Sequence, residues 1–97
     1  MVLAVLARGP AYGYDLTQVL ETESEGALAV KEGTLYPILY RFEALGFVEP
    51  HWDVPDRGVP RKYYRITVEG RRELEERMVE WRQVAKAVES LMGRAQH

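Results

Sequence analysis

The chain has 97 residues, of which 46% are hydrophobic and 29% are charged, the size and composition of one folded domain. It contains no cysteine, which excludes disulfide bonds and thiolate metal sites and favours a reducing, cytoplasmic setting, and it has no apolar run of the roughly 20 residues that a membrane span requires. The net charge of −2 argues weakly against binding to nucleic acid, but the distribution of the charges matters more than their sum.

The first half of the chain predicts three helices. Residues 1–8 form an apolar run without a basic start, which predicts a short buried helix and not a signal peptide. A second helix is expected over residues 12–22, a very short strand over residues 28–30, and a third helix over residues 32–45, ended by Gly46. Helical spacing points one set of apolar side chains toward the core: Leu16, Val19, Leu20, Leu35, Ile38, Leu39, Phe42 and Leu45.

The outward side of the third helix is small, aromatic and basic, and it lacks the mixture of Glu and Lys that is typical of a solvated helix. This helix offers Thr34, Tyr36, Pro37, Tyr40 and Arg41. Hydroxyl and guanidinium groups can contact phosphates or base edges, so this side is a candidate DNA-binding face. Pro37 lacks a backbone donor and is expected in or near the first turns. The alternative is that Tyr40 and Arg41 are ordinary surface residues.

Residues 47–53 and 61–66 predict two strands, joined by a turn that contains two prolines and a glycine. Four basic residues and no acid lie within residues 57–65, whereas the first third of the chain carries five acidic and two basic residues. The hairpin can be a solvated basic turn, and at least one of Tyr63 and Tyr64 is expected in the core because neighbours alternate along a strand. Any contact with a polyanion should use the basic residues of this hairpin: Arg57, Arg61 and Lys62.

Thr67 is expected to cap a last helix that runs to Met92, just before Gly93. Its apolar residues form a heptad seam flanked by charge: Leu74, Met78, Trp81, Ala85, Val88 and Met92. The seam can pack against the first helix of the same chain or against a second copy. A helix of about 26 residues, near 39 Å at 1.5 Å per residue, is longer than so small a core can cover, which favours a homodimer.

The order helix, helix, short strand, helix, hairpin, helix predicts an α+β, mainly α fold. We expect a winged helix-turn-helix of three helices and a β-hairpin wing over residues 1–66, and a C-terminal dimerisation helix over residues 67–97. Enzymatic chemistry is not expected, because the two serines have no plausible base beside them and there is no Gly-rich phosphate loop. With two histidines and no cysteine, the sequence predicts no metal site and no cofactor.

Several segments carry motifs in a fixed order along the chain. They are residues 9–16 (GPAYGYDL), 33–37 (GTLYP), 41–43 (RFE), 46–48 (GFV) and 60–67 (PRKYYRIT), the last followed by Gly70. In this order and spacing they resemble the PadR-type transcriptional regulators. The match covers nearly the whole chain, and GTLYP and RKYYRIT are its most specific parts. The short C-terminal region resembles the subfamily with a single dimerisation helix.

The resemblance implies a homodimeric winged helix repressor that binds double-stranded DNA at an inverted-repeat operator. It implies DNA contacts from the third helix and the wing, at Thr34, Tyr36, Pro37, Tyr40, Arg57, Arg61 and Lys62. In multidrug-sensing members a tryptophan at the position of Trp81 stacks planar ligands between the subunits, and other members respond to phenolic acids. A planar aromatic molecule is therefore a candidate ligand at Trp81, which can alternatively be a packed core residue.

The chain departs from the family pattern at three places, one of which, Phe42 in place of a common leucine, is a larger core side chain with little functional consequence. Members usually have residues ahead of the position of Met1 that complete a first helix in the dimer interface, so the short start here implies a smaller interface or a truncated chain. Lys31 stands where a Ser or Asn cap is common, and it adds charge to the predicted DNA-binding set but loses the cap. Two other functions stay open: a winged helix that binds proteins and no DNA, and a ligand-binding protein that has lost DNA binding.

Overall fold

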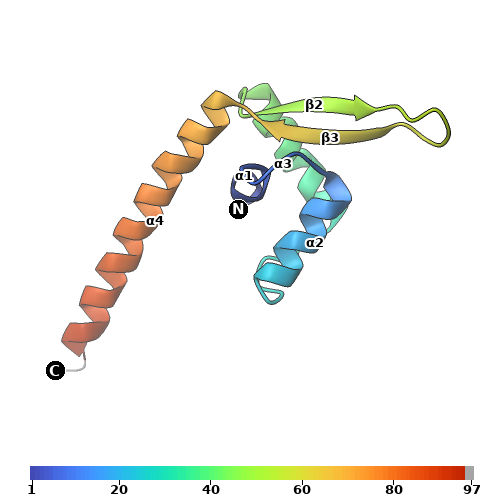
Figure 1. Cartoon of the computed structure of the whole chain (residues 1–97). Helices are drawn as coiled ribbons and strands as arrows, with labels where there is room; N and C mark the ends of the chain where they lie inside the picture. Colours follow the sequence, from blue (N-terminus) through green and yellow to red (C-terminus); the bar gives the residue numbers. More distant parts are fainter. Residues whose placement is uncertain (96–97) are drawn as a thin grey trace.

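The computed structural model describes residues 1–95 as a small winged body from which one long helix projects (Figure 1). In chain order the elements are α1 (Val2–Leu6), β1 (Ala11–Tyr12), α2 (Gly13–Glu23), α3 (Glu32–Ala44), β2 (Val48–Asp53), β3 (Arg61–Ile66) and α4 (Val68–Ala95). Among these residues no helix is both long enough and apolar enough to cross a membrane. The mixed, mainly helical winged fold expected from the sequence is confirmed.

The sheet is antiparallel with strand order β1-β3-β2. β2 and β3 form the wing hairpin, and β1 adds to the other edge of β3, with Ala11 opposite Tyr64. The prediction of a short strand over residues 28–30 is wrong, because the third strand is β1. Those residues follow a turn in which the Leu28 N–H bonds the Ser24 hydroxyl and the Ala29 N–H bonds the Gly26 carbonyl, so these donors are not available to a sheet.

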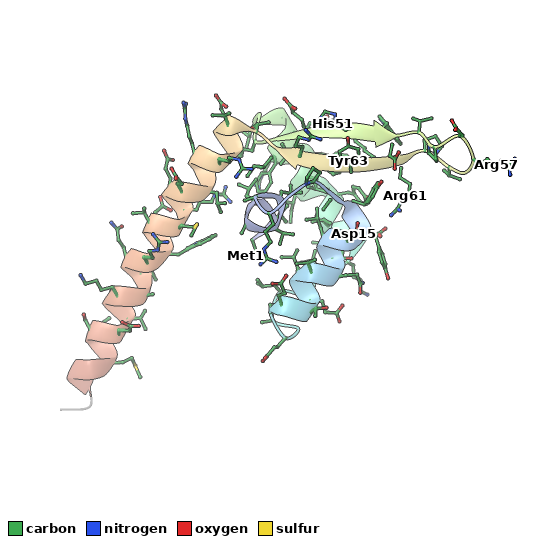
Figure 2. The ribbon with its side chains drawn as sticks, viewed as in Figure 1. Met1, Asp15, His51, Arg57, Arg61 and Tyr63 are labelled. Atoms are coloured by element: carbon green, nitrogen blue, oxygen red, sulfur yellow. The ribbon has the colours of Figure 1, made fainter. Side chains whose placement is uncertain are left out.

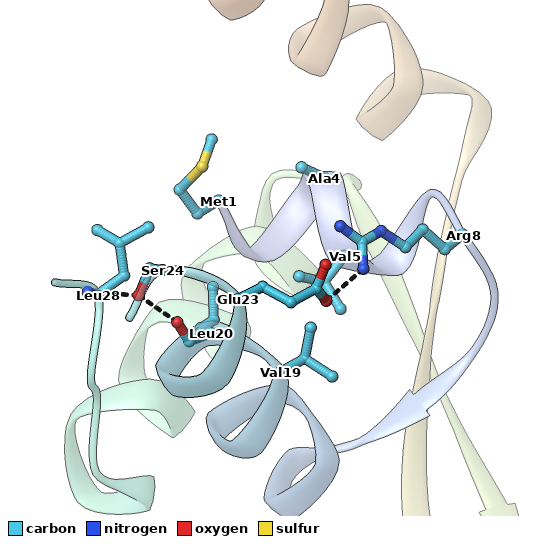
Figure 3. A pocket seen from close by; sticks show the side chains of 9 residues that line it. All are labelled: Met1, Ala4, Val5, Arg8, Val19, Leu20, Glu23, Ser24 and Leu28. Carbon is cyan, nitrogen blue, oxygen red and sulfur yellow. Dashed lines mark hydrogen bonds and ion pairs between the residues drawn. The ribbon is translucent and has the colours of Figure 1, made fainter. Parts of the chain in front are cut away.

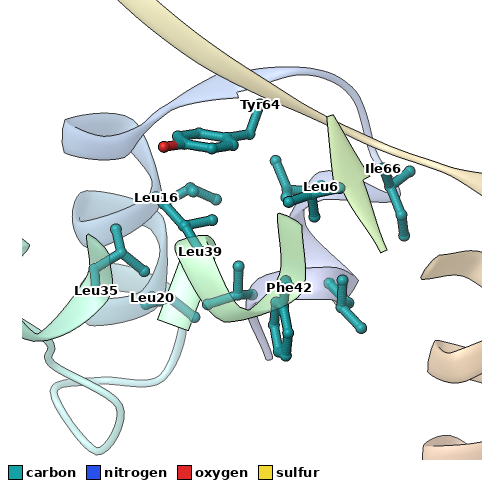
Figure 4. Close-up of a cluster of buried hydrophobic side chains, with 11 residues drawn as sticks. Leu6, Leu16, Leu20, Leu35, Leu39, Phe42, Tyr64 and Ile66 are labelled. Atoms are coloured by element: carbon teal, nitrogen blue, oxygen red, sulfur yellow. The ribbon is translucent and has the colours of Figure 1, made fainter. Parts of the chain in front are cut away.

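One apolar core joins α1, α2, α3 and the inner face of the sheet (Figure 4). Its buried hydrophobic residues are Val2, Leu3, Leu6, Leu16, Leu20, Leu35, Leu39, Phe42, Val48, Tyr64 and Ile66. The inward set expected from helical spacing is thus largely confirmed, with Val19 and Ile38 only partly buried. The prediction that Leu45 faces the core is wrong, because α3 ends at Ala44 and Leu45 lies exposed at its C-cap.

Phe47, two residues after Leu45, makes the apolar contact with the core that Leu45 does not make. Gly46 has a positive φ of 79°, which turns the chain back after α3. Phe47 then packs against the core, with its ring centroid 5.9 Å from that of Phe42. The end of α3 thus decides that Phe47, which is partly buried, packs against the core while Leu45 stays exposed.

Thr67 caps α4 and also ties it to the turn between α3 and β2. Its hydroxyl accepts a hydrogen bond from the Gly70 N–H at 3.0 Å and donates to the Gly46 carbonyl, while its own N–H donates to the Phe47 carbonyl. The predicted N-cap is confirmed. The predicted end is wrong, because α4 continues through Gly93 to Ala95. One glycine costs a helix only about 1 kcal/mol, so it need not stop one.

Gly70 sets how closely α4 approaches the winged body. A Cβ atom at this position would lie 2.1 Å from the Phe47 carbonyl oxygen and 2.8 Å from Ile66 Cγ1. Because the first of these atoms belongs to the backbone, it cannot move aside cheaply. We expect Gly70→Ala to lower the free energy of unfolding by about 1–3 kcal/mol, the usual cost of overpacking, and to lower the melting temperature measured by circular dichroism.

Gly93→Ala is the matched control for this prediction. It also lies in α4, but a Cβ atom there meets nothing within 4 Å. Alanine favours a helix over glycine, so we expect this variant to melt at or slightly above the wild-type temperature. Equal melting temperatures for Gly70→Ala and the wild type would show that the start of α4 is not packed as described.

Candidate nucleic-acid interface

Two tyrosines stand one turn apart on α3. The ring centroids of Tyr36 and Tyr40 are 6.1 Å apart. Tyr40 is exposed, whereas Tyr36 is half-buried against the start of α2. A Cβ atom at Gly13 would lie 2.5 Å from the Tyr36 hydroxyl oxygen. Because glycine has no side chain, the Tyr36 ring can pack against the first residue of α2. The contact fixes the start of α2 against the first half of α3.

The solvent-facing side of α3 carries the other residues predicted there for DNA binding: Lys31, Thr34, Pro37 and Arg41, all of them exposed. Lys31 is the N-cap residue and makes no side-chain capping bond, as expected from the sequence. Pro37 lies inside the helix, where it removes one backbone donor to the Gly33 carbonyl. Because Gly33 is itself exposed, water can satisfy that carbonyl and the helix continues unbroken.

Lys62 connects the base of the wing with α3. It lies on the same face of β3 as Tyr64, and its Nζ is 5.3 Å from the ring centroids of both Tyr40 and Tyr64. Burial lowers the pKa of Lys62, but the Tyr64 hydroxyl and the Glu43 carboxylate raise it by more, so the pKa lies above its ordinary value. The ammonium group therefore stays charged beside the exposed tyrosine of α3.

Arg61 turns toward the start of α2, and Arg57 stands at the far tip of the wing (Figure 2). The Arg61 guanidinium carbon lies 3.9 Å from the ring centroid of Tyr12. The Tyr12 hydroxyl donates a hydrogen bond of 2.7 Å to Asp53 Oδ2 at the end of β2. Arg61 of β3 thus stacks on the ring of Tyr12 from β1, whose hydroxyl bonds Asp53 of β2 on the other side of β3.

A cavity of about 210 Å³ opens where the starts of α2 and α3 meet β3. It is lined by Tyr12, Gly13, Tyr14, Glu32, Tyr36, Arg61 and Lys62. The structure therefore brings Tyr36, Arg61 and Lys62, predicted from two separate segments, to one place. Two basic residues against one carboxylate, together with tyrosines in the lining, suit a negatively charged and hydrogen-bonding ligand such as a phosphate.

Comparison with known proteins decides the family. The profile described as "Transcriptional regulator PadR-like family" matches residues 2–76. The chain belongs to this PadR-like family. Its members are transcriptional regulators and not enzymes, which agrees with the function class expected from the sequence.

Solved structures of other proteins share the PadR-like fold over most of the chain. A transcriptional regulator from Clostridium thermocellum is 28% identical, with a TM-score of 0.83 over 92% of this chain and 84% of its own. A PadR family regulator from Eggerthella lenta is 36% identical, with a TM-score of 0.80 over 94% of this chain and 80% of its own. PadR from Bacillus subtilis, solved in complex with operator DNA, is 26% identical, with a TM-score of 0.74 over 80% of this chain and 44% of its own.

The seam on α4 of the PadR-like chain divides into two parts. Its first residues, Leu74 and Met78, are half-buried, and Leu74 packs against the core of its own chain. From Trp81 onward the helix leaves the body, and Trp81 and Val88 are 41% and 51% exposed (Figure 1). Packing within the chain, one of the two roles left open by the sequence, thus applies only to the start of the seam.

The structure also shows residues beside the predicted surfaces that the sequence analysis missed. Val84 and Leu91 are exposed and lie three residues after Trp81 and Val88, so they widen the apolar stripe on α4. The same 3–4 spacing could have revealed them. The sequence predicted Tyr12 as the first residue of a helix. In the structure Tyr12 belongs to β1, and the pairing of β1 with β3 places it beside Arg61.

Another cavity, of about 240 Å³ and mainly apolar, lies between α1, α2 and the segment that follows α2 (Figure 3). Met1, Ala4, Val5, Val19, Leu20 and Leu28 supply its apolar lining. An ion pair between Arg8 and Glu23 lies at its rim. In the part of the chain that the structure describes, this groove and the outer half of α4 are both apolar and open to solvent.

Proposed function

We propose that this protein is a cytoplasmic, homodimeric transcriptional repressor that binds double-stranded DNA at an inverted-repeat operator. The observation that carries the proposal is the placement of Lys62 of the wing against Tyr40 of α3, which joins a cationic strand to an exposed aromatic and basic helix face. Support comes from the Bacillus subtilis PadR, whose structure was solved with operator DNA.

The two parts of this surface have different roles in the proposal. An α-helix about 10–12 Å across fits the major groove, which is about 12 Å wide, so α3 presents Thr34, Tyr40 and Arg41 to base edges. Tyr36 and Pro37 shape the helix surface beside the groove. The cationic groups supply affinity by neutralising phosphates without reading sequence: Lys31, Arg57, Arg61 and Lys62.

Dimerisation in this proposal uses the open apolar surfaces of two copies. The side chains from Trp81 to Met92 pair across a twofold axis, and the end of α4 covers the groove between α1 and α2 of the other copy. Each surface is apolar and faces solvent in the single chain, so reciprocal burial stabilises both. A twofold dimer would also place two α3 helices about one DNA turn, roughly 34 Å, apart.

The test is binding of the purified protein to the DNA upstream of its own gene, measured by gel shift with and without random competitor DNA. We expect a complex that resists competitor at low salt and weakens steeply as salt increases, because phosphate contacts release counterions. Weak binding that random DNA abolishes would refute the operator-binding repressor. Complete absence of DNA affinity would favour the alternative, a winged helix that binds proteins.

We propose in addition that a planar aromatic molecule releases the repressor by binding at Trp81. The supporting observation is that Trp81 lies on the apolar stripe of α4 and is 41% exposed, so two copies of its ring can face each other across the dimer axis. We expect planar aromatic compounds to quench up to about half of the fluorescence, since Trp81 is one of two tryptophans.

Trp81→Phe supplies the control for this ligand test. The remaining fluorophore, Trp52, lies on β2 and is 62% exposed, so it reports on non-specific quenching. The emission of Trp81→Phe should stay nearly constant over the same titration. Equal fractional quenching of the variant and the wild type would count against a ligand site at Trp81.

A further inference from the structure

The sheet places a carboxylate, that of Asp53, where it could form an ion pair with Arg61. In the register of the wing, Arg61 lies directly opposite Asp53. Opposite residues of an antiparallel pair have Cβ atoms about 4.5–5.5 Å apart and share one face, and a carboxylate is the natural bidentate partner of a guanidinium group. An ion pair between these two side chains would leave Arg61 with little net charge to offer a phosphate.

The structure shows a different arrangement of these groups. Over the described residues 1–95, Arg61 and Asp53 form no ion pair, although their strands are paired at these positions. Asp53 Oδ2 instead accepts the hydrogen bond of 2.7 Å from the Tyr12 hydroxyl. Arg61 instead lies over the Tyr12 ring, 3.9 Å from the centroid. Tyr12 of β1 therefore contacts both residues, Asp53 through its hydroxyl and Arg61 through its ring.

We propose that Tyr12 is a positioning residue for DNA binding, which holds Asp53 with its hydroxyl and supports Arg61 with its ring so that the guanidinium stays available to a DNA phosphate. This inference rests on the proposed function and assigns a role to a residue outside the predicted DNA-binding set. Stacking uses the flat face of the guanidinium, so its in-plane N–H donors remain free for a phosphate. Arg61 also lines the cavity at the start of α2, next to Lys62.

The protonation state of Tyr12 supports this role. Its hydrogen bond to Asp53 is the main cause that raises the pKa of Tyr12 above its ordinary value. The hydroxyl therefore keeps its proton at neutral pH and can act as the donor to the carboxylate. Phenylalanine keeps the ring and loses only this donor, so Tyr12→Phe separates the two contributions.

The experiment measures operator affinity by fluorescence anisotropy over a range of salt concentrations for four proteins: wild type, Tyr12→Phe, Asp53→Asn and the double variant. We expect Tyr12→Phe to bind about 5- to 10-fold more weakly and with a shallower salt dependence, because the freed Asp53 pairs with Arg61. Adding Asp53→Asn should restore affinity to within about twofold, because the carboxylate that competes is gone. Asp53→Asn alone should bind at least as well as the wild type.

Two readouts exclude a merely structural role of Tyr12. All four proteins should unfold cooperatively at similar melting temperatures. In an Arg61→Ala background, adding Tyr12→Phe should not weaken DNA binding further. Wild-type affinity in Tyr12→Phe, or a loss that Asp53→Asn does not rescue, would overturn the role of Tyr12 while operator binding stands. If the wild type itself does not bind DNA, the proposed function fails, and the role of Tyr12 in it fails too.

Discussion

A Val88→Asp substitution is expected to convert the dimer into monomers and to reduce operator affinity by more than about 100-fold. Val88 lies on the apolar stripe of α4 and is 51% exposed in the single chain, so the carboxylate is tolerated there and the protomer still folds. In a twofold dimer the same position buries two unpaired charges, and each costs about 3–5 kcal/mol. Sedimentation equilibrium and gel shift measure the two effects on the same sample.

Val79→Asp is the matched control, because it makes the same chemical change on the opposite side of the same helix. Val79 is nine residues before Val88, which is half a rotation away at 100° per residue, and it is 49% exposed. We expect this variant to remain dimeric and to bind the operator as the wild type does. A dimeric Val88→Asp protein, or dissociation of both variants, would contradict the assignment of the interface to this stripe.

The double substitution Arg61→Ala/Lys62→Ala is expected to weaken operator binding by about 100- to 1,000-fold at 0.1 M salt. Both side chains line the cavity between β3 and the starts of α2 and α3. If each neutralises one phosphate, a dimer loses four such contacts, and the slope of log affinity against log salt decreases by about four. Anisotropy titrations at several salt concentrations give both quantities.

Tyr40→Ala provides the comparison for this wing variant. It removes an exposed ring from α3 and no charge, so the salt dependence should be nearly unchanged. What should change is the discrimination between the operator and variants with altered base pairs. If the wing variant kept its salt dependence, or lost affinity for the operator and not for random DNA, the assignment of Arg61 and Lys62 to phosphates would be wrong.

The amino-acid sequence alone was sufficient to predict the helices and the wing hairpin, apart from some of their ends. Periodicity over more than ten residues predicted α3 to within one residue at its end, and the tyrosine-rich run after the Pro/Gly turn predicted β3 without error. The cap at Thr67 and the apolar spacing on α4 were equally visible. These features depend on neighbours within one or two turns, so the local pattern contains the information that determines them.

Only the tertiary structure decided which distant residues meet. Tyr12 and Asp53 are 41 positions apart, and their hydrogen bond depends on β1 pairing with β3. Competition for a limited core and a limited sheet edge decides the place of the short edge strand, the packing of Phe47 in preference to Leu45 against the core, and the division of the α4 stripe. A local pattern shows that a residue can be buried or paired, whereas the packing of the whole chain determines which candidate takes the place.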